Sequence, residues 1–480
     1  MSVILDSRRL QLRPDQARAV EMSTGTHPIF AIQAAYGTGK TVIGGTAIQA
    51  AYGTGKTVTV TARLSVPGEL VIATATTNVA IAQFIETLLR LDEFSHLPIL
   101  RFVADSALQE GVPRTPVDLH TILQSLLSRY FNRLHPQEIR RMRRYTRGRR
   151  LLEQLLFHPE QLSRLSEEER EEYRIAEMCN SEATERAIAI LLRLQFPAVL
   201  CITTSSLLNS TREGGLFHEL LSSCRTIIAD EASQIPEIPV FVAMVTRFPQ
   251  ACHIYIGDVH QLQPHLRCPR SALAARLGGR GVMSLLLSRN IPLAPLVTTF
   301  RAHPALVHLS NTLVYDGTLE SGTPAHRRND LILRLSLPKP RVPFVLVNDQ
   351  CCRDIIRGLL SRDVPSSSIG VITFYKEQQH RLQEYTDRLG VALYTVDSVQ
   401  GREMDVAIVL TTRTDVDEAS GNFLNDIQRM NVALTRCKYG QFVLGYLNAL
   451  HTLSNWSQLV AWAARRNTIV ETVDLPDIFS

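Results

Sequence analysis

The sequence predicts an α/β protein with two parallel sheets, each in a domain of its own. Short apolar, β-branched segments alternate with helical segments, as in βαβ units whose sheets are buried on both faces. In the N-terminal part the expected strands cover residues 28–34, 69–76, 198–204, 225–231 and 252–258. In the C-terminal part they cover residues 341–347, 367–374, 391–397, 405–412 and 441–447.

Length and composition agree with several folded domains. A chain of 480 residues suggests two to four domains at roughly 150 residues each. Hydrophobic residues make up 45% and charged residues 20%, which excludes disordered and collagen-like classes. The net charge of +5 is too small to indicate a partner, because the field depends on where the charges lie. We expect a first domain at 1–280 and a second at 281–480.

The segment of about residues 85–195 carries no convincing strand but many Leu, Arg and Glu at helical spacing, so we expect a helical insert in the first domain. Seven arginines lie between Arg140 and Arg150, and the run SEEEREE follows at 166–172. One interpretation is a solvated pair of helices whose charges neutralise each other. The other is a stalk that contacts phosphates, because arginine pairs bidentately with phosphate oxygens.

Cysteine usage and hydropathy bear on the compartment. Eight cysteines are present and no two have the CxxC spacing of a zinc knuckle or a redox pair, so we expect reduced thiols. There is no signal-peptide pattern and no unbroken run of 18 apolar residues. We therefore expect an intracellular protein of the nucleus or cytoplasm that does not use a membrane.

One motif occurs twice. The eleven residues AIQAAYGTGKT stand at 31–41 and again at 47–57. Each copy reads A-x-x-x-x-G-K-T, a Walker A loop with Ala in place of the first Gly. In such a loop the backbone N–H groups surround phosphates, Lys reaches the β- and γ-phosphates and Thr binds Mg²⁺. The first copy supplies the residues Gly37, Thr38, Gly39, Lys40 and Thr41, and the second supplies Gly53, Thr54, Gly55, Lys56 and Thr57.

The segment before each copy favours the first one. PIFAIQA precedes the first loop and is a good strand, whereas GGTAIQA precedes the second, and its two glycines weaken a strand. Only one copy can occupy the joint between strand and helix. We therefore predict that Lys40 and Thr41 bind the phosphates and Mg²⁺ and that the second copy is not used. The alternative is the reverse assignment.

Two further strands end on polar residues. IIADE ends on Asp230 and Glu231, an arrangement in which one carboxylate holds Mg²⁺ and the next orients the attacking water. Asp258 and Gln261 follow the strand at 252–258, and we expect both to face the γ-phosphate from the carboxyl end of the sheet. The alternatives are a helix cap for the acidic pair and an ordinary polar loop for Gln261.

Six motifs then occur in a specific order. They are GTGKT, DEASQ, GDVHQLQP, TTFRAHP at 298–304, VDSVQGRE at 396–403 and NVALTRCK at 431–438. In this order they resemble the superfamily 1 helicases, and most of all the 5′-to-3′ group that includes the nonsense-mediated-decay helicase. The resemblance implies two RecA-like P-loop domains, ATP and Mg²⁺ as cofactors, and ATP-driven translocation or unwinding along single-stranded DNA or RNA.

The resemblance also implies roles for single residues. Gln16 resembles the glutamine that reads adenine, and Glu403 is similar to the glutamate that contacts the ribose. Arg301 and Arg436 match two arginines that reach the γ-phosphate as arginine fingers. The alternative for each arginine is a surface salt bridge. The sequence departs from the family at residues 34–37, where Ala-Ala-Tyr-Gly replaces Gly-Pro-Pro-Gly.

Contacts with nucleic acid are expected at two segments, TATTNVAIAQF at 74–84 and ITTSSLLNS at 202–210, which resemble strand-gripping motifs of the family. Thr and Asn at a strand end can donate to phosphates, but such residues also cap helices. One rival function is a nucleotide-regulated binding protein with weak or no turnover because of the duplicated loop. A weaker rival is a P-loop kinase or GTPase. The sequence leaves protein partners unidentified.

Overall fold

The computed structural model describes residues 2–23, 25, 27–44, 69–91, 97–158, 166–266, 272–348, 351–411 and 418–480. The second copy of the duplicated motif, Gly53 to Thr57, lies outside these residues. The chain forms two compact units. The first comprises Met1–Ile32, Thr41–Gly257 and Pro264–Ala294, and the second comprises Gln33–Lys40, Asp258–Gln263 and Pro295–Ser480.

The first unit is built on a seven-stranded sheet with the order β5-β6-β4-β7-β8-β3-β9. The strands are β3 (Ile29–Ala34), β4 (Leu70–Ala75), β5 (Ile99–Arg101), β6 (Val199–Thr203), β7 (Cys224–Ala229), β8 (Cys252–Gly257) and β9 (Leu293–Leu296). The pairs from β5 to β8 are parallel. All five strands expected in this half are confirmed. Their side chains are almost wholly buried on both faces, as the apolar runs predict.

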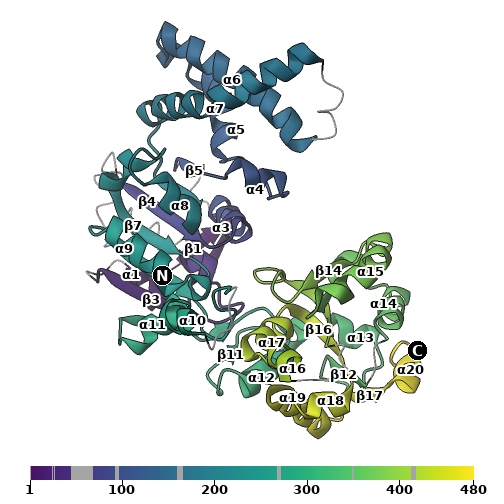
Figure 1. The fold of residues 1–480 in the computed structure, drawn as a ribbon. Coiled ribbons are helices and arrows are strands. Elements are labelled where there is room, and N and C mark those ends of the chain that lie inside the picture. Colours follow the sequence, from purple (N-terminus) through teal and green to yellow (C-terminus); the bar gives the residue numbers. More distant parts are fainter. Residues whose placement is uncertain are drawn as a thin grey trace. The chain divides into compact units, whose positions relative to one another are not determined.

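Helices of the first unit connect its strands (Figure 1). They include α1 (Pro14–Ser23), α3 (Asn78–Arg90), α8 (Thr204–Ser210), α9 (Val242–Arg247), α10 (Leu273–Gly278) and α11 (Val282–Ser288). A short antiparallel hairpin, β1 (Ser2–Leu5) and β2 (Arg8–Gln11), precedes them. Helix α3 buries Ile81, Phe84 and Ile85, in accordance with its apolar spacing.

The insert is largely helical, but it differs from the expectation at its start. Strand β5 lies inside the range 85–195 and pairs with β6 in the sheet. Three residues are too few to show a strand pattern in the sequence, and only the pairing partner defines them. The helical part comprises α4 (Asp105–Gln109), α5 (Leu119–Tyr130), α6 (Pro136–Phe157) and α7 (Glu167–Leu194). Helices α5, α6 and α7 pack on one another (Figure 1).

The second unit holds a six-stranded sheet with the order β14-β13-β15-β16-β12-β17, in which every pair is parallel. The strands are β12 (Phe344–Asn348), β13 (Ile369–Thr373), β14 (Ala392–Thr395), β15 (Met404–Leu410), β16 (Cys437–Leu444) and β17 (Ile469–Glu471). The five strands expected in this half are confirmed. Strand β17 adds an edge that the sequence pattern did not indicate.

Helices cover the second sheet on both faces and give it two apolar cores. One core receives α12 (Pro304–Leu313), α17 (Ile427–Leu434) and α19 (Ser454–Arg465). The other receives α13 (Asp330–Arg334), α14 (Cys352–Ser361), α15 (Lys376–Leu389) and the C-terminal α20 (Leu475–Ile478). This is the doubly covered parallel sheet that RecA-like domains share.

The structure also bears on the cysteines and on membrane spans, in both cases for the described residues alone. The six cysteines whose side chains the structure describes are free thiols, and among the described residues no cluster of His, Cys, Asp and Glu could hold a metal ion. None of the helices described has both the length and the apolar character that crossing a membrane requires.

Candidate functional site

The first copy of the Walker A motif forms a tight loop directly after β3. Gly37 has φ +67° and Gly39 has φ +79°, a left-handed conformation that glycine adopts without strain. A Cβ at Gly37 would lie 2.7 Å from Cβ of Arg301, so the position also requires the absence of a side chain. The two glycines of GTGKT are thus explained by backbone conformation and close packing.

The substitution of Gly-Pro-Pro by Ala34-Ala35-Tyr36 is accommodated by burial. Tyr36 is 2% exposed, and its hydroxyl shares a hydrogen bond of 2.7 Å with Ser310 Oγ. Burial raises the pKa of the Tyr36 phenol, so the side chain is neutral. The loop is therefore held by an aromatic anchor where the family pattern has prolines.

Lys40 and Thr41 lie at the start of a helical segment, residues 40–44, and both are half-buried. This is the joint of strand, loop and helix that a phosphate-binding loop requires, with N–H groups at the helix start.

The acidic pair follows β7. The Asp230 N–H donates to Thr74 O at 2.8 Å and so continues the sheet, while the Glu231 N–H donates to Asp230 Oδ1 at 2.8 Å. Glu231 has φ +49°, which is uncommon for a residue with a Cβ and is often found at functional positions. Although Glu231 precedes a 3₁₀ turn at Ala232–Gln234, its side chain makes no capping hydrogen bond there. A helix cap therefore does not explain Glu231.

Asp258 is the centre of a buried hydrogen-bond network after β8. It is fully buried, and its carboxylate accepts hydrogen bonds from Gln33 Nε2 at 3.0 Å and from the His260 N–H at 3.0 Å. Gln261 Nε2 at 2.9 Å and the Tyr315 hydroxyl at 2.7 Å donate to its other oxygen. Gln261 is thus a buried member of this network.

Arg436, between the end of α17 and the start of β16, meets this network. It is 1% exposed, and one of its terminal nitrogens lies 3.3 Å from Gln261 Oε1. Its Nε donates to Val432 O at 3.0 Å. A surface salt bridge, the alternative for this arginine, does not fit so buried a position.

Arg301 and Glu403 are also brought together. Arg301 Nε lies 3.1 Å from Glu403 Oε2, and Lys438 Nζ lies 2.8 Å from Glu403 Oε1. Partial burial alone would raise the pKa of Glu403, but Arg301 and Lys438 outweigh it and hold that pKa below its usual value. The Arg301 guanidinium also lies 5.7 Å from the Tyr36 ring centroid and donates to Thr435 O at 2.9 Å.

Gln16 occupies the first turn of α1. Its Oε1 accepts a hydrogen bond of 3.0 Å from the Arg13 N–H, and the residue is half-buried. The side chain is thereby oriented by the helix start.

The two segments with strand-gripping character both begin helices. Thr77 accepts a hydrogen bond from the Ala80 N–H at 3.2 Å and caps α3. Thr203 accepts from the Ser206 N–H at 3.3 Å and caps α8. Both threonines therefore have the capping role that was the alternative at these positions.

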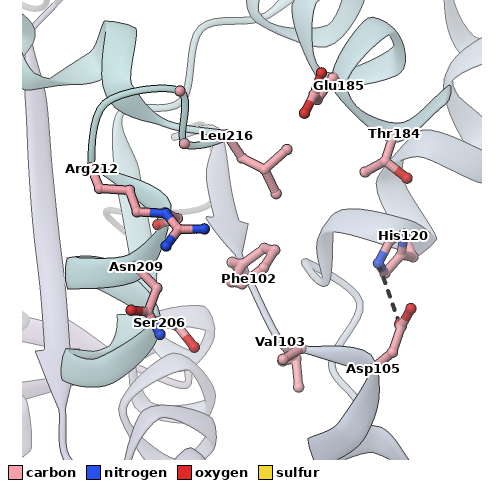
Figure 2. Close-up of a pocket in the computed structure, with 14 residues that line it drawn as sticks. Phe102, Val103, Asp105, His120, Thr184, Glu185, Ser206, Asn209, Arg212 and Leu216 are labelled. Atoms are coloured by element: carbon pink, nitrogen blue, oxygen red, sulfur yellow. Dashed lines mark ion pairs between the residues drawn. The ribbon is translucent and has the colours of Figure 1, made fainter. Parts of the chain in front are cut away.

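A pocket of about 440 Å³ opens beside α8, where β5 and β6 end. Figure 2 shows Ser206, Asn209 and Arg212 on one wall, with hydroxyl, amide and guanidinium groups of the kind that contact phosphate oxygens. His120 and Asp105 lie on the opposite wall, 3.7 Å apart. The segment 202–210 thus borders a cavity as well as starting a helix.

The opposite wall is held by a buried cation. Arg149 of α6 is 1% exposed and binds both Asp105 oxygens, at 2.7 and 2.9 Å, as well as Glu153 at 2.8 Å. Burial and the nearby Arg149 lower the pKa of His120 from 6.5 to about 4. The imidazole is therefore neutral at neutral pH, and Nδ1 lies 2.7 Å from the Tyr145 hydroxyl.

Sequence reasoning missed two members of the Asp258 network. Tyr315 lies in no recognised motif, and only its hydrogen bond to Asp258 reveals it. Asn431 begins NVALTRCK, and its Nδ2 donates to the Tyr315 hydroxyl at 3.0 Å and to His260 O at 2.8 Å. The position of Asn431 in the motif was a signal that could have been used.

Comparison with known proteins places these features in a family. Two family models, both described as AAA domains, match residues 11–267 and 348–448, and the first covers more than half of the chain. Human probable helicase senataxin is 28% identical over 78% of this chain and 15% of its own length. The regulator of nonsense transcripts 1 homolog of Arabidopsis thaliana is 26% identical over 96% of this chain and 34% of its own length.

Two further similarities are to a yeast relative and to a solved viral structure. The ATP-dependent helicase NAM7 of Saccharomyces cerevisiae is 28% identical over 52% of this chain and 28% of its own length, so the chain spans about a third or less of these three relatives. A solved structure of Arterivirus nonstructural protein 10, a helicase in complex with DNA, has a TM-score of 0.41 and 14% identity, covering 91% of this chain and 65% of that one. On the family match and these relatives, the chain belongs to the AAA domain family of superfamily 1 helicases, in the group that includes the nonsense-mediated-decay helicase.

Proposed function

We propose that this chain is an ATP-dependent helicase or translocase that acts on single-stranded DNA or RNA. The observation that best supports the proposal is the contact of Arg436 with Gln261, because it joins an arginine of NVALTRCK to the glutamine of GDVHQLQP. A P-loop kinase or GTPase has no reason to combine these two side chains. The proposed domains are residues 1–280, with the insert, and 281–480, with the two arginines.

The roles follow the chemistry of each side chain. Lys40 neutralises the β- and γ-phosphates of ATP, and the N–H groups of Gly37, Thr38 and Gly39 donate to them. Glu231 accepts a proton from, or orients, the attacking water, and Gln261 helps to align it. Arg301 and Arg436 stabilise the charge that develops on the γ-phosphate.

Two residues of the site fit a magnesium ion. Thr41 and Asp230 offer a hydroxyl and a carboxylate oxygen, the hard donors that Mg²⁺ binds. When bound, Mg²⁺ would neutralise phosphate charge and align the leaving group. The remaining roles are Gln16 toward adenine and Glu403 toward ribose. Glu403 is paired with Arg301 in the structure, and its carboxylate retains acceptor sites for a ribose hydroxyl.

The single-stranded nucleic acid is proposed to contact the segments 74–84 and 202–210. A helix cap and a phosphate contact are compatible, because the threonine oxygen accepts from the backbone while its O–H remains able to donate. Phosphate contacts position a strand without reading its sequence. This interpretation accounts for the polar wall beside α8 in Figure 2.

The test is ATPase activity measured with no nucleic acid, with single-stranded DNA and with single-stranded RNA, at a stated salt concentration. We expect stimulation by at least one strand, and a stimulation constant that weakens steeply with salt as counterions are released. Lys40→Ala should abolish hydrolysis, while its matched control Lys56→Ala should change it little. A rate indifferent to every nucleic acid would favour the nucleotide-regulated binding protein. Inactivity of Lys56→Ala alone would move the site to the second copy.

A further inference from the structure

Helix α6 carries a stripe of exposed arginines. Arg140, Arg143, Arg147 and Arg150 follow one another at intervals of three or four residues, so they share one face of the helix. All four are exposed. Like charges at this spacing destabilise a helix, so the stability of α6 does not explain the stripe. The exposed arginines of the stripe can contact a partner of opposite charge.

The stripe borders a groove of about 990 Å³ between α5 and α6. Arg143, Arg147 and Arg150 line it, and no aspartate or glutamate is among the described residues that do so. The side contributed by α5 and the turn after it includes Leu127 and Phe131, and Phe131 is 51% exposed. The groove therefore combines several cations with an accessible aromatic ring.

The ion pairs described for the neighbouring arginines do not involve Arg143 or Arg150. Arg149 points to the interior and binds Asp105 and Glu153. The ion pair between Arg193 of α7 and Glu138 of α6 uses none of the seven arginines. In the part of the chain that the structure describes, no ion pair involves Arg143 or Arg150. These two guanidinium groups are therefore exposed cations that line the groove.

We propose that the α5–α6 groove binds a single-stranded nucleic acid, with Arg143 and Arg150 on phosphates and Phe131 stacked on a base. Guanidinium groups pair bidentately with phosphate oxygens, and an aromatic ring beside a cationic groove is the pattern of single-strand binding. The distance along the helix axis from Arg143 to Arg150 is about 10 Å, roughly three nucleotide steps of a stacked strand. A duplex would not offer an unstacked base to Phe131.

This contact goes beyond the proposed ATP-driven activity and does not depend on nucleotide. The insert would then contact the single-stranded nucleic acid independently of the segments 74–84 and 202–210. An acidic protein segment would satisfy the arginines but would leave the exposed aromatic ring without a planar partner, which is why the observations favour nucleic acid.

The test measures binding of a fluorescent strand of about 16 nucleotides, as oligothymidylate and as oligouridylate, without ATP. Arg143→Ala/Arg150→Ala should weaken binding about tenfold at low salt and reduce the slope of log affinity against log salt by about 1.4, because each phosphate contact contributes about 0.7. Phe131→Ala should weaken binding about tenfold with the slope unchanged, because stacking releases no counterion. Photocrosslinking to a bromouridine strand should label the peptide that contains Phe131.

The matched control is Arg381→Ala/Arg388→Ala on α15, which removes two exposed arginines and the same net charge. Equal weakening by both double variants would mean a general charge effect and would overturn the proposal. Tighter binding of a polyglutamate peptide, lost in Phe131→Ala, would identify an acidic protein partner instead and also overturn it. Thermal unfolding checks that the variants remain folded. Lys40→Ala should bind the strand in this groove normally, so failure of the ATP site and failure of the groove are separable.

Discussion

The network around Asp258 and the arginine stripe of α6 use charged side chains in opposite ways. In the network, four donors converge on one buried carboxylate, and Arg436 is 1% exposed. On α6, Arg143 and Arg150 are exposed beside an open groove. A buried charge must have all its partners inside the fold, whereas an exposed one remains available to a partner outside it.

The same contrast occurs between two adjacent residues. Arg149 is buried and makes three hydrogen bonds to two carboxylates, while Arg150 is exposed at the groove. Neighbours on a helix point about 100° apart, so one faces the interior and the other faces solvent. The loss of stability on substituting an arginine of α6 should therefore depend on whether its side chain faces the interior or the solvent.

The largest effect is expected for Asp258→Ala. It removes the acceptor of Gln33, Gln261 and Tyr315 and leaves the Gln261 amide and the Tyr315 hydroxyl buried without this acceptor. We expect the free energy of unfolding to fall by about 3–5 kcal/mol, measured by urea denaturation. Arg381→Ala, which breaks an exposed pair on α15, is the control and should cost less than about 1 kcal/mol. Equal effects of the two variants would contradict the comparison.

Next in size is Arg436→Lys. Lysine keeps the charge but lacks the planar fork that lets Arg436 donate to Val432 O and face Gln261 together. We expect kcat for ATP hydrolysis to fall by at least about a hundredfold with nearly unchanged ATP binding, measured by steady-state kinetics and nucleotide titration. If kcat stays at the wild-type value, Arg436 has only a structural role. Arg388→Lys on the exposed face of α15 is the matched control.

The smallest effect concerns His120, which lies beside the buried Arg149. Its pKa of about 4 in the folded protein is below the value of 6.5 expected when unfolded. Between these values the unfolded chain takes up a proton that the folded protein does not, so stability falls as the pH drops from 6.5 toward 4. At pH 5 the loss is about 2 kcal/mol. It is absent above about pH 7, where both forms are neutral.

The measurement is urea unfolding at pH 7 and pH 5, compared with His120→Asn. The variant should lose less stability between the two pH values than the wild type. An exposed histidine, His380 on α15, provides the control substitution His380→Asn, which should leave the difference unchanged. Identical pH dependence in His120→Asn and the wild type would show that His120 does not remain neutral in the fold.

Much of the fold could be predicted because local patterns carry it. Ten apolar, β-branched segments became ten strands, and their alternation with helices indicated parallel sheets. Strand β5 was missed because three residues give no period, and a pairing partner that lies about a hundred residues away in the sequence defines it. Motif spacing likewise located the loop with Lys40 and the turn with Glu231, since each follows a strand directly.

What the sequence determined by itself was the strands, the order of the motifs and the family to which they point, since these depend on neighbours along the chain. Only the tertiary structure decided which polar residues act together. Tyr315 joins Asp258 across 57 positions, and Arg149 is buried while Arg150 is not. Which side chains are buried, and which groups they pair with, depends on which surfaces meet in the fold. A buried charge without a partner is energetically costly, so each buried charge is found beside groups that pair with it.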